Sequence, residues 1–435
     1  MADPNLLDGI GVVGISEMCS GLHTGLVHHF HGLSHFFPEL LFGPIVPKLI
    51  KLSVHKNPTL RHFTGTAKGV APPASDFLFT FSLNLYKQLQ AEEGTNSNIV
   101  CSPFSIAAAL SMINAGARNN TQKQISHLLH VKDPDIHDKF CVFFDRFCFL
   151  PPEMMLFIAS RIYASFEFTP LEDFACLLKR IYKSSMKGIE FRGDPNVSRC
   201  QVNSWVAETT KFMIRNCLPL SAFQKTTQVV LANAVYFRGF WESPFRLDAA
   251  SRVAFHEDAT TTKAADMMFR RGTFMMCYSD ELKVTALKIP YRGGKMSLVV
   301  LFPEKVDGLT TLVKQLTPCK LTRLLRDITR PMRIELRLPK FKLEHTIDLK
   351  ETLSVMGATD LFTERADLSG MSVPPCPLFS SAIHKCVLDL NEEGDETAAD
   401  AGMEGVSLTL DHPFMFLVEH HDPVAIIFMG VLRKI

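Results

Sequence analysis

Two side chains that could act as a nucleophile and a base lie close together near the C-terminal end of the sequence. Cys386 and His384 are two residues apart in a stretch, 382–390, that alternates like a β-strand. Residues two apart point to the same face of a strand, so the thiol and the imidazole would be neighbours. Leu388 and Leu390 share that face, and a polar pair among apolar residues is typical of a buried, hydrogen-bonded core. We therefore interpret the pair as structural.

Motifs of well-known enzyme families are absent from the sequence. The residues Gly293-Gly294-Lys295 precede an apolar run rather than a helix, which excludes a phosphate-binding P-loop. The sequence contains neither the G-x-S-x-G motif of serine hydrolases nor the H-E-x-x-H motif of zinc proteases. We therefore do not expect an enzyme, and no cofactor is predicted.

Histidines cluster in the first 70 residues, where seven of the 16 histidines lie. If this stretch were helical, His28, His31 and His35 would share one face and could meet a metal ion. Gly32 weakens such a helix, and no carboxylate is apparent nearby to orient the imidazoles. The 11 cysteines are scattered without a C-x-x-C pair. No metal site is therefore predicted.

The 46 basic and 45 acidic residues give a net charge of +1, so there is no overall attraction to nucleic acid or to an acidic membrane. A local excess of positive charge occurs between residues 320 and 342. Such a cluster could contact a glycosaminoglycan, but alternating Arg and apolar residues are also what a solvent-exposed strand face requires. We favour the strand and keep a weak glycosaminoglycan contact as the alternative. The basic residues are Lys320, Arg323, Arg326, Arg330, Arg333, Arg337, Lys340 and Lys342.

Apolar residues recur at helical spacing in three stretches. Between residues 77 and 89 they repeat every four residues, which predicts an amphipathic helix. A second helix is predicted over 103–116, because Ser102 can cap it and Pro103 suits its first turn. A third helical face lies between residues 202 and 209.

Three other stretches are typical of strands. Residues 229–237 and 297–302 are continuous apolar runs, as in strands buried on both faces, whereas 333–338 alternates polar and apolar residues. No repeat or flexible linker interrupts the sequence after residue 74. We therefore predict one α+β domain over residues 71–435, with helices packed on large sheets, and an N-terminal extension over residues 1–70.

Signals for localisation point in two directions. The tripeptides that begin at Asn119 and Asn196 are glycosylation sequons, which fit an extracellular, secreted glycoprotein. The first residues lack the basic segment and the unbroken apolar run of a secretory signal. The uncharged stretch 18–38 contains five histidines, so it does not suit a membrane span. We expect an extracellular protein. An intracellular one, which would explain the many cysteines, is the alternative.

Seven segments of the chain, taken together and in this order, resemble a known family. From about Ala74 to Ile435 the chain resembles a serpin, a member of the serine protease inhibitor superfamily. The segments are 98–105 (NIVCSPFS), 231–241 (LANAVYFRGFW), 338–344 (LPKFKLE), 366–371 (ADLSGM), 383–385 (IHK), 391–394 (NEEG) and 412–416 (HPFMF).

The resemblance implies a fold with three β-sheets, about nine helices and an exposed reactive-centre loop near the C-terminus. In this family a serine protease cleaves the loop and becomes attached to it. The loop then inserts into the central sheet as a new strand and carries the protease across the molecule, which distorts its active site. The expected function is therefore inhibition of serine proteases by suicide cleavage, and the expected state is a monomer.

By resemblance, two groups of residues control the opening of the central sheet. The first, the shutter, is a polar cluster beneath the place where the sheet opens, and its residues are Ser102, Ser105, Asn233 and His384. The second, the breach, lies where the loop first enters the sheet, and its residues are Trp241, Lys340 and Glu392.

The hinge of the loop is matched by Glu392, Glu393, Gly394, Asp395, Glu396 and Thr397. In serpins the cleaved bond lies about seventeen residues along from the first glutamate, and 392 + 16 gives Leu408–Thr409. Leu408 would suit a chymotrypsin-like or elastase-like pocket. About ten residues usually separate the bond from the proline matched by Pro413, whereas 413 − 408 leaves five. Counting back from Pro413 gives a bond near Gly402–Met403, with about nine insertable residues that span roughly 30 Å.

Insertion requires loop side chains to alternate between the core and solvent. They do so from Thr397 to Ser407, with acidic residues at outward positions. Asp395 departs from the family pattern, which has Ser or Thr at this position. Burying its carboxylate on insertion would cost several kcal/mol. The short loop and Asp395 leave a second hypothesis open, a non-inhibitory serpin that is a carrier, chaperone or binding protein.

Overall fold

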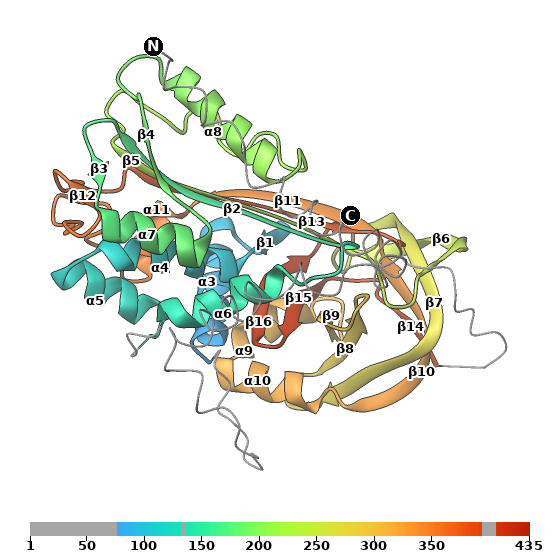
Figure 1. Cartoon of the computed structure of the whole chain (residues 1–435). Helices are drawn as coiled ribbons and strands as arrows, with labels where there is room; N and C mark the ends of the chain where they lie inside the picture. Colours follow the sequence, from blue (N-terminus) through green and yellow to red (C-terminus); the bar gives the residue numbers. More distant parts are fainter. Residues whose placement is uncertain (1–75, 132–135, 394–405) are drawn as a thin grey trace, which may run out of the picture. The chain divides into compact units, whose positions relative to one another are not determined.

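The computed structural model of the chain describes residues 76–131, 136–393 and 406–435 (Figure 1). The N-terminal extension, with His28, His31 and His35, lies outside the described residues, as do the hinge residues Gly394, Asp395, Glu396 and Thr397. Over the described residues the chain forms nine helices and three β-sheets, which confirms the expected fold.

Three of these nine helices agree with the stretches of helical spacing. Residues 77–89 lie in α3, and Ser102 caps α4 by accepting a hydrogen bond from the Ser105 N–H, with Pro103 in the first turn. Residues 202–209 lie in α8. The helices are α3 (Asp76–Glu93), α4 (Pro103–Gly116), α5 (Asn119–Leu128), α6 (Ile136–Phe147), α7 (Glu172–Tyr182), α8 (Pro195–Thr209), α9 (Gly308–Gln315), α10 (Pro318–Asp327) and α11 (Leu349–Val355).

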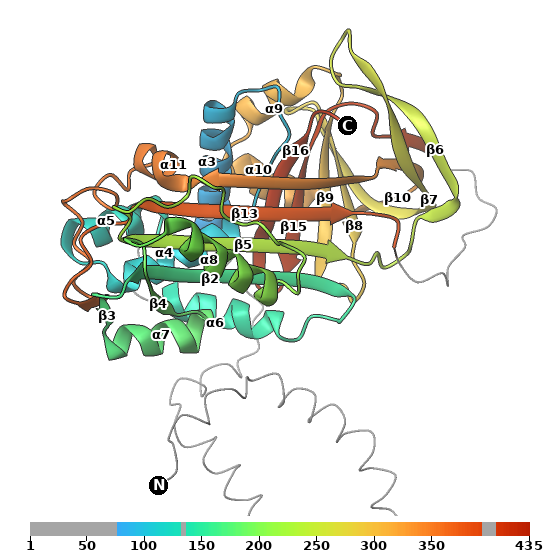
Figure 2. The ribbon, with the colours of Figure 1, turned by 90° about the horizontal axis from the view of Figure 1, so that it is seen from above.

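A five-stranded sheet forms the upper layer of the molecule in Figure 1. Its strands, in spatial order, are β11 (Phe341–Asp348), β13 (Ser381–Leu390), β5 (Val229–Gly239), β2 (Met154–Ser165) and β4 (Met186–Ile189). The central pair, β13 and β5, is parallel, and their arrowheads point the same way in Figure 2. The neighbours on either side, β11 and β2, are antiparallel to this pair.

A second sheet has nine strands and contains the C-terminus of the chain. Its main path is β1 (Ile99–Cys101), β16 (Val424–Leu432), β15 (Phe414–His421), β9 (Met296–Pro303), β8 (Val284–Pro290), β7 (Thr262–Ser279), β10 (Arg330–Pro339) and β14 (Val406–Thr409), and β6 (Arg246–His256) pairs with β7. The third sheet joins only β3 (Thr169–Pro170) and β12 (Ser372–Val373).

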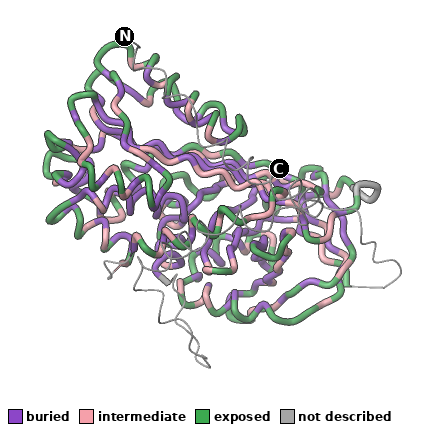
Figure 3. The backbone as a smooth tube through the Cα atoms, viewed as in Figure 1, coloured by how far each residue is buried: buried purple, intermediate pink, exposed green. Residues whose placement is uncertain are grey.

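The main core lies between the two large sheets and the helices packed against them, where buried residues concentrate in Figure 3. The apolar runs at 229–237 and 297–302 form β5 and β9, and the residues of both runs are buried. Helix α8 lies on the opposite face of the five-stranded sheet (Figure 1). A smaller apolar cluster attaches it there, with Val202 and Val206 of α8 packed among Val230, Ile383 and their neighbours.

Candidate functional site

The junction between β5 and β13, called the seam below, is the feature around which the expected site residues gather. Eight residue pairs align across it, from Val230 opposite Ser381 to Phe237 opposite Leu388. The chain leaves β13 at Leu390 and continues directly into residues 391–405. Whatever follows β13 therefore begins at one end of the seam.

The four shutter residues form one buried hydrogen-bonded cluster beneath the middle of the seam. The backbone N–H of Ser102, which caps α4, donates to His384 Nε2 at 3.1 Å. The hydroxyl of Ser102 donates to the Ile427 carbonyl of β16 at 2.7 Å. Ser105 and Asn233 hydrogen-bond to each other, with Asn233 Nδ2 at 2.8 Å from Ser105 Oγ. The cluster thus joins α4, β16 and both strands of the seam.

Within this cluster, His384 makes a hydrogen bond that crosses the seam. Because Nε2 accepts from Ser102, the proton of the neutral imidazole is on Nδ1, which donates to Asn233 Oδ1 at 2.6 Å. His384 and Asn233 are direct partners in the strand register. Burial, and to a lesser extent His345, lowers the pKa of His384 to about 3, so the imidazole is neutral at physiological pH.

Cys386, two residues after His384, does not form a catalytic pair with it. Its thiol donates to the Val100 carbonyl at 3.0 Å, while His384 is bonded to Ser102 and Asn233. Burial raises the pKa of Cys386 well above its usual value, which disfavours a nucleophilic thiolate. The structural interpretation of this pair agrees with these contacts.

The three breach residues meet at the end of the seam where the loop begins. Lys340 Nζ lies 2.7 Å from Glu392 Oε2. The indole of Trp241 donates to the Asn391 carbonyl at 2.7 Å, and its backbone N–H donates to the Glu393 carbonyl at 3.0 Å. The indole is buried and stacked on Tyr291, with ring centroids 4.6 Å apart. The first residues of the loop are therefore fastened to the sheet.

Sequence reasoning missed a further set of contacts at this end of the seam. Arg238 of β5 forms an ion pair with Glu393, and two residues earlier Tyr236 donates a long hydrogen bond of 3.5 Å to Asp389 of β13. Burial, and then the Asp389 carboxylate, raises the pKa of Tyr236, so it remains a neutral phenol. The spacing of Tyr236 and Arg238 on one strand face was a usable signal, but their partners required the register between two distant strands.

The Leu408–Thr409 bond is not in an exposed loop. Both residues belong to β14, which is parallel to β10 with Leu408 opposite Leu336 and Thr409 opposite Arg337. Leu408 is partly buried and packs against the main core. The count from Glu392 led to this position because it assumes a loop of usual length, whereas here β14 already begins at Val406. The neighbourhood of Gly402–Met403 lies outside the described residues.

Several residues of the basic stretch are paired rather than collected into one patch. Lys320 and Arg323 approach Glu281 at 2.9 and 3.9 Å, and Lys342 approaches Glu344 at 3.0 Å. The stretch 333–338 lies within β10, as its alternation indicates.

The acceptor asparagines of both sequons are exposed, whereas the hydroxyl residues Thr121 and Ser198 are buried. The Asn196 side chain is exposed at the start of α8, and the exposed Asn119 donates to Asp367 at 2.7 Å. No helix within residues 76–131, 136–393 and 406–435 is both long enough and apolar enough to cross a membrane.

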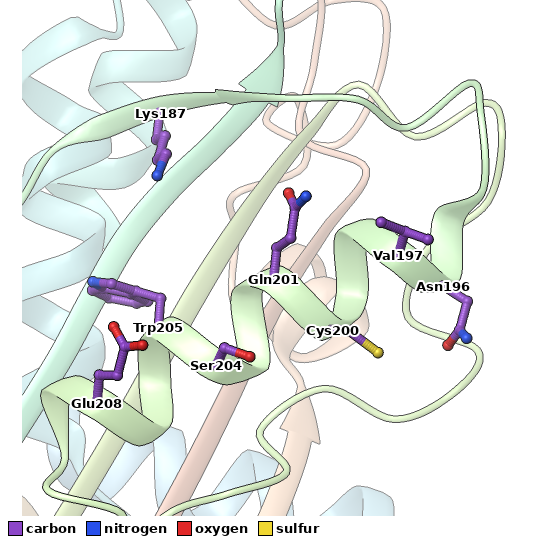
Figure 4. A pocket seen from close by; sticks show the side chains of 8 residues that line it. All are labelled: Lys187, Asn196, Val197, Cys200, Gln201, Ser204, Trp205 and Glu208. Carbon is purple, nitrogen blue, oxygen red and sulfur yellow. The ribbon is translucent and has the colours of Figure 1, made fainter. Parts of the chain in front are cut away.

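An open groove of about 520 Å³ lies between α8 and β4 (Figure 4). Lys187 reaches into it from β4, whereas Trp205 and Glu208 extend from α8. The side chains of α8 in Figure 4 spread along the helix rather than converge on one point. This groove therefore lacks the arrangement of acid, base and nucleophile that catalysis requires.

The sequence and the structure were compared with known proteins. The family model described as "Serpin (serine protease inhibitor)" matches residues 78–435. The protein named Iris from Ixodes ricinus is 43% identical over 83% of this chain and 99% of its own length. Leukocyte elastase inhibitor of Bos taurus is 33% identical over 81% of this chain and 97% of its own. The crystal structure of uncleaved ovalbumin superimposes with a TM-score of 0.79 at 28% identity, covering 84% of this chain and all of that one.

Proposed function

The chain belongs to the serpin family of serine protease inhibitors, and we propose that it inhibits by inserting residues of the segment 394–405 into the seam between β5 and β13. The proposed activity is that of an inhibitor and not of an enzyme. One observation carries the proposal: the segment follows β13 directly, at the end of a parallel pair of strands. A strand that turns back from β13 into the seam would pair antiparallel with both neighbours, and antiparallel ladders are slightly more stable per residue than parallel ones.

The contacts at the two ends of this path support the proposed roles of the shutter and the breach. The His384–Asn233 hydrogen bond crosses the seam in its middle and must break when a strand enters. The Lys340–Glu392 ion pair and the Trp241 hydrogen bonds hold the start of the loop. Opening would therefore begin at the breach and pass over the shutter.

We propose that the protease cleaves before β14, near Gly402–Met403, rather than at Leu408–Thr409. Proteolysis takes place in exposed, unpaired segments, and cleavage at Leu408 would require β14 to separate from β10. Residues 394–412 contain no Lys or Arg, which excludes a protease that requires a basic residue before the bond. Glycine and methionine suit a shallow apolar pocket, and one relative is named leukocyte elastase inhibitor. An elastase-like or chymotrypsin-like protease is the proposed target.

The short loop favours a second candidate function. About nine insertable residues would nearly match the ten residues of β13, with no residue to spare for the attached protease. Asp395 would add the cost of a buried carboxylate at the first inserted position. If insertion is too slow, the protein is a substrate, and the alternative is a non-inhibitory carrier, chaperone or binding serpin.

Incubation with elastase-like and chymotrypsin-like proteases, followed by denaturing electrophoresis, tests the proposal. An inhibitor gives a covalent complex that survives denaturation, and the mass of the released C-terminal peptide identifies the cleaved bond. A nicked band without any complex, for every protease that cleaves between residues 394 and 405, would rule out inhibition. Cleavage at Leu408–Thr409 would overturn the proposed bond but not the proposed function.

We also propose an extracellular, monomeric glycoprotein with glycans on Asn119 and Asn196. The exposure of both acceptor asparagines supports this. Intact mass of the natively expressed protein, before and after enzymatic deglycosylation, tests the glycans. A weak glycosaminoglycan contact at Lys320–Lys342 stays a prediction, and retention on immobilised heparin at physiological salt tests it.

A further inference from the structure

The seam is closed on its outer face by a group of side chains, called the clasp below, that consists of Tyr236, Arg238, Asp389 and Glu393. Tyr236 and Arg238 project from β5, and Asp389 and Glu393 belong to β13 and the residues that follow it. The last aligned pair of the seam is Phe237 opposite Leu388. The clasp therefore lies where an inserting strand would first enter.

Both contacts of the clasp join the two sides of the seam. Arg238 pairs with Glu393, and Tyr236 donates to Asp389. By contrast, the Lys340–Glu392 pair joins the loop to the connection between β10 and β11, which lies on the far side of β13. The Arg238 contact is thus the ion pair that directly opposes separation of β5 from the start of the loop.

Insertion and the clasp exclude each other on geometric grounds. Neighbouring strands lie about 4.8 Å apart, so a new strand between β5 and β13 moves them apart by about that distance. The hydrogen bond between Tyr236 of β5 and Asp389 of β13 cannot survive this separation. The Arg238 side chain is also restricted by its surroundings, because it is only 24% exposed.

We propose that Arg238 is a positioning residue that holds Glu393, and with it the following loop, outside the seam until a protease cleaves the loop. This inference rests on the proposed insertion mechanism and adds a determinant of its rate. The guanidinium provides a charged contact with a half-exposed carboxylate. Glu393 thereby acquires a role separate from that of Glu392.

Hydrogen exchange of the uncleaved full-length chain tests the clasp without any protease. In Arg238→Met the amides of 229–239 and 381–390 should exchange about tenfold faster, because the seam opens more often. Glu393→Gln removes the charge of the more exposed partner and should accelerate exchange to the same extent. This variant replaces Arg238→Met in the test if Arg238→Met does not fold. The exchanged pair Arg238→Glu with Glu393→Arg should return the rate to within about threefold of the original.

The control is Arg192→Met, which removes the Arg192–Glu167 pair beside β4, at the opposite edge of the same sheet. Its exchange at the seam should be unchanged. The dependence of seam exchange on salt distinguishes an ion pair from a merely structural role, because salt screens only the charged contact. Raising ionic strength should accelerate seam exchange in the original chain but not in Arg238→Met.

The inference is overturned if Arg238→Met and Glu393→Gln leave seam exchange unchanged, or if the exchanged pair fails to restore it. The proposed function fails separately, through the absence of a covalent complex. Faster seam exchange in the two variants, without any covalent complex in the protease assay, would support the clasp and refute inhibition. A covalent complex together with unchanged seam exchange would support inhibition and refute the clasp.

Discussion

His384 is neutral in the folded chain because it is buried and because its Nε2 accepts from the Ser102 backbone. In the unfolded chain the same imidazole takes up a proton near pH 6.5. Above that pH both states are neutral, so the group contributes no dependence on pH. Between pH 6.5 and about 3 the unfolded chain binds a proton that the folded chain does not, and the folded chain loses stability as pH falls.

We expect this difference to be measurable as a change in the free energy of unfolding. Each pH unit within the window changes stability by about 1.4 kcal/mol, so the original chain should lose about 2 kcal/mol from this group between pH 7 and pH 5. His384→Gln should be less stable at pH 7 but should lack this part of the slope. Denaturant unfolding at the two pH values measures both, with His127→Gln of the exposed surface of α5 as the control. Equal slopes in His384→Gln and the original chain would contradict the buried neutral imidazole.

At the scale of elements, the breach joins the loop to the sheet through the Lys340–Glu392 ion pair and two hydrogen bonds of Trp241. Glu392→Lys would put two ammonium groups beside each other where Lys340 now lies 2.7 Å from a carboxylate. The seam should open more easily at the breach and accept strands from other molecules. Polymers should therefore form several-fold faster on mild heating. Native electrophoresis after heating measures the monomer that remains.

The matched control for this variant is Glu167→Lys, whose partner Arg192 lies beside β4 at the far edge of the sheet. It introduces the same change of charge without touching the loop. Equal polymer formation by the two variants would attribute the effect to net charge rather than to the breach.

The loop itself provides the next prediction, because Asp395 is the residue that disagrees with an inserting strand. If insertion follows cleavage, its carboxylate must enter a slot of low dielectric constant. Asp395→Thr should lower that barrier, and even about 1.4 kcal/mol would speed insertion tenfold. The products should then change from nicked protein toward covalent complex on a denaturing gel.

A second change separates the effect of the Asp395 carboxylate from the effect of the loop's length. Five small polar residues added before Val406 lengthen the loop and leave the pairing of β14 with β10 intact. If neither change, nor both together, yields a complex with a protease that cleaves the loop, the non-inhibitory serpin is the better account.

Features that depend on neighbouring residues could be predicted from the sequence, whereas features that depend on the pairing of distant strands could not. The helix over 103–116 and the strand over 229–237 could be predicted because capping and apolar period depend on neighbouring residues. The resemblance led to the shutter residues, which the structure brings together. The Arg238–Glu393 pair and the position of Leu408 in β14 could not be predicted locally. Both depend on which distant strands align, and a count along a loop cannot reveal that.

At the scale of the whole molecule, the described helices and strands begin at Asp76 and the family match begins at residue 78. We expect deletion of residues 1–70 to change the melting temperature by less than about 2 °C, because the family match begins only at residue 78. Differential scanning calorimetry of the full-length and shortened chains measures this. A large fall would mean that the extension belongs to the folded domain.

The pairing of β1 with β16 means that the nine-stranded sheet cannot be completed until β16 has been synthesised. Ile99–Cys101, near the beginning of the described chain, align with residues 429–431, and β15 and β16 fill the space between β1 and β9. At about 5 to 20 residues per second, synthesis of 435 residues takes roughly 20 to 90 s. The edge of β1 lacks its partner after residue 101 is made, and the edge of β9 lacks its partner after residue 303 is made, until β15 and β16 follow. Unpaired edges invite association with other chains. Folding of the nine-stranded sheet therefore depends on protection of these edges until β15 and β16 have left the ribosome.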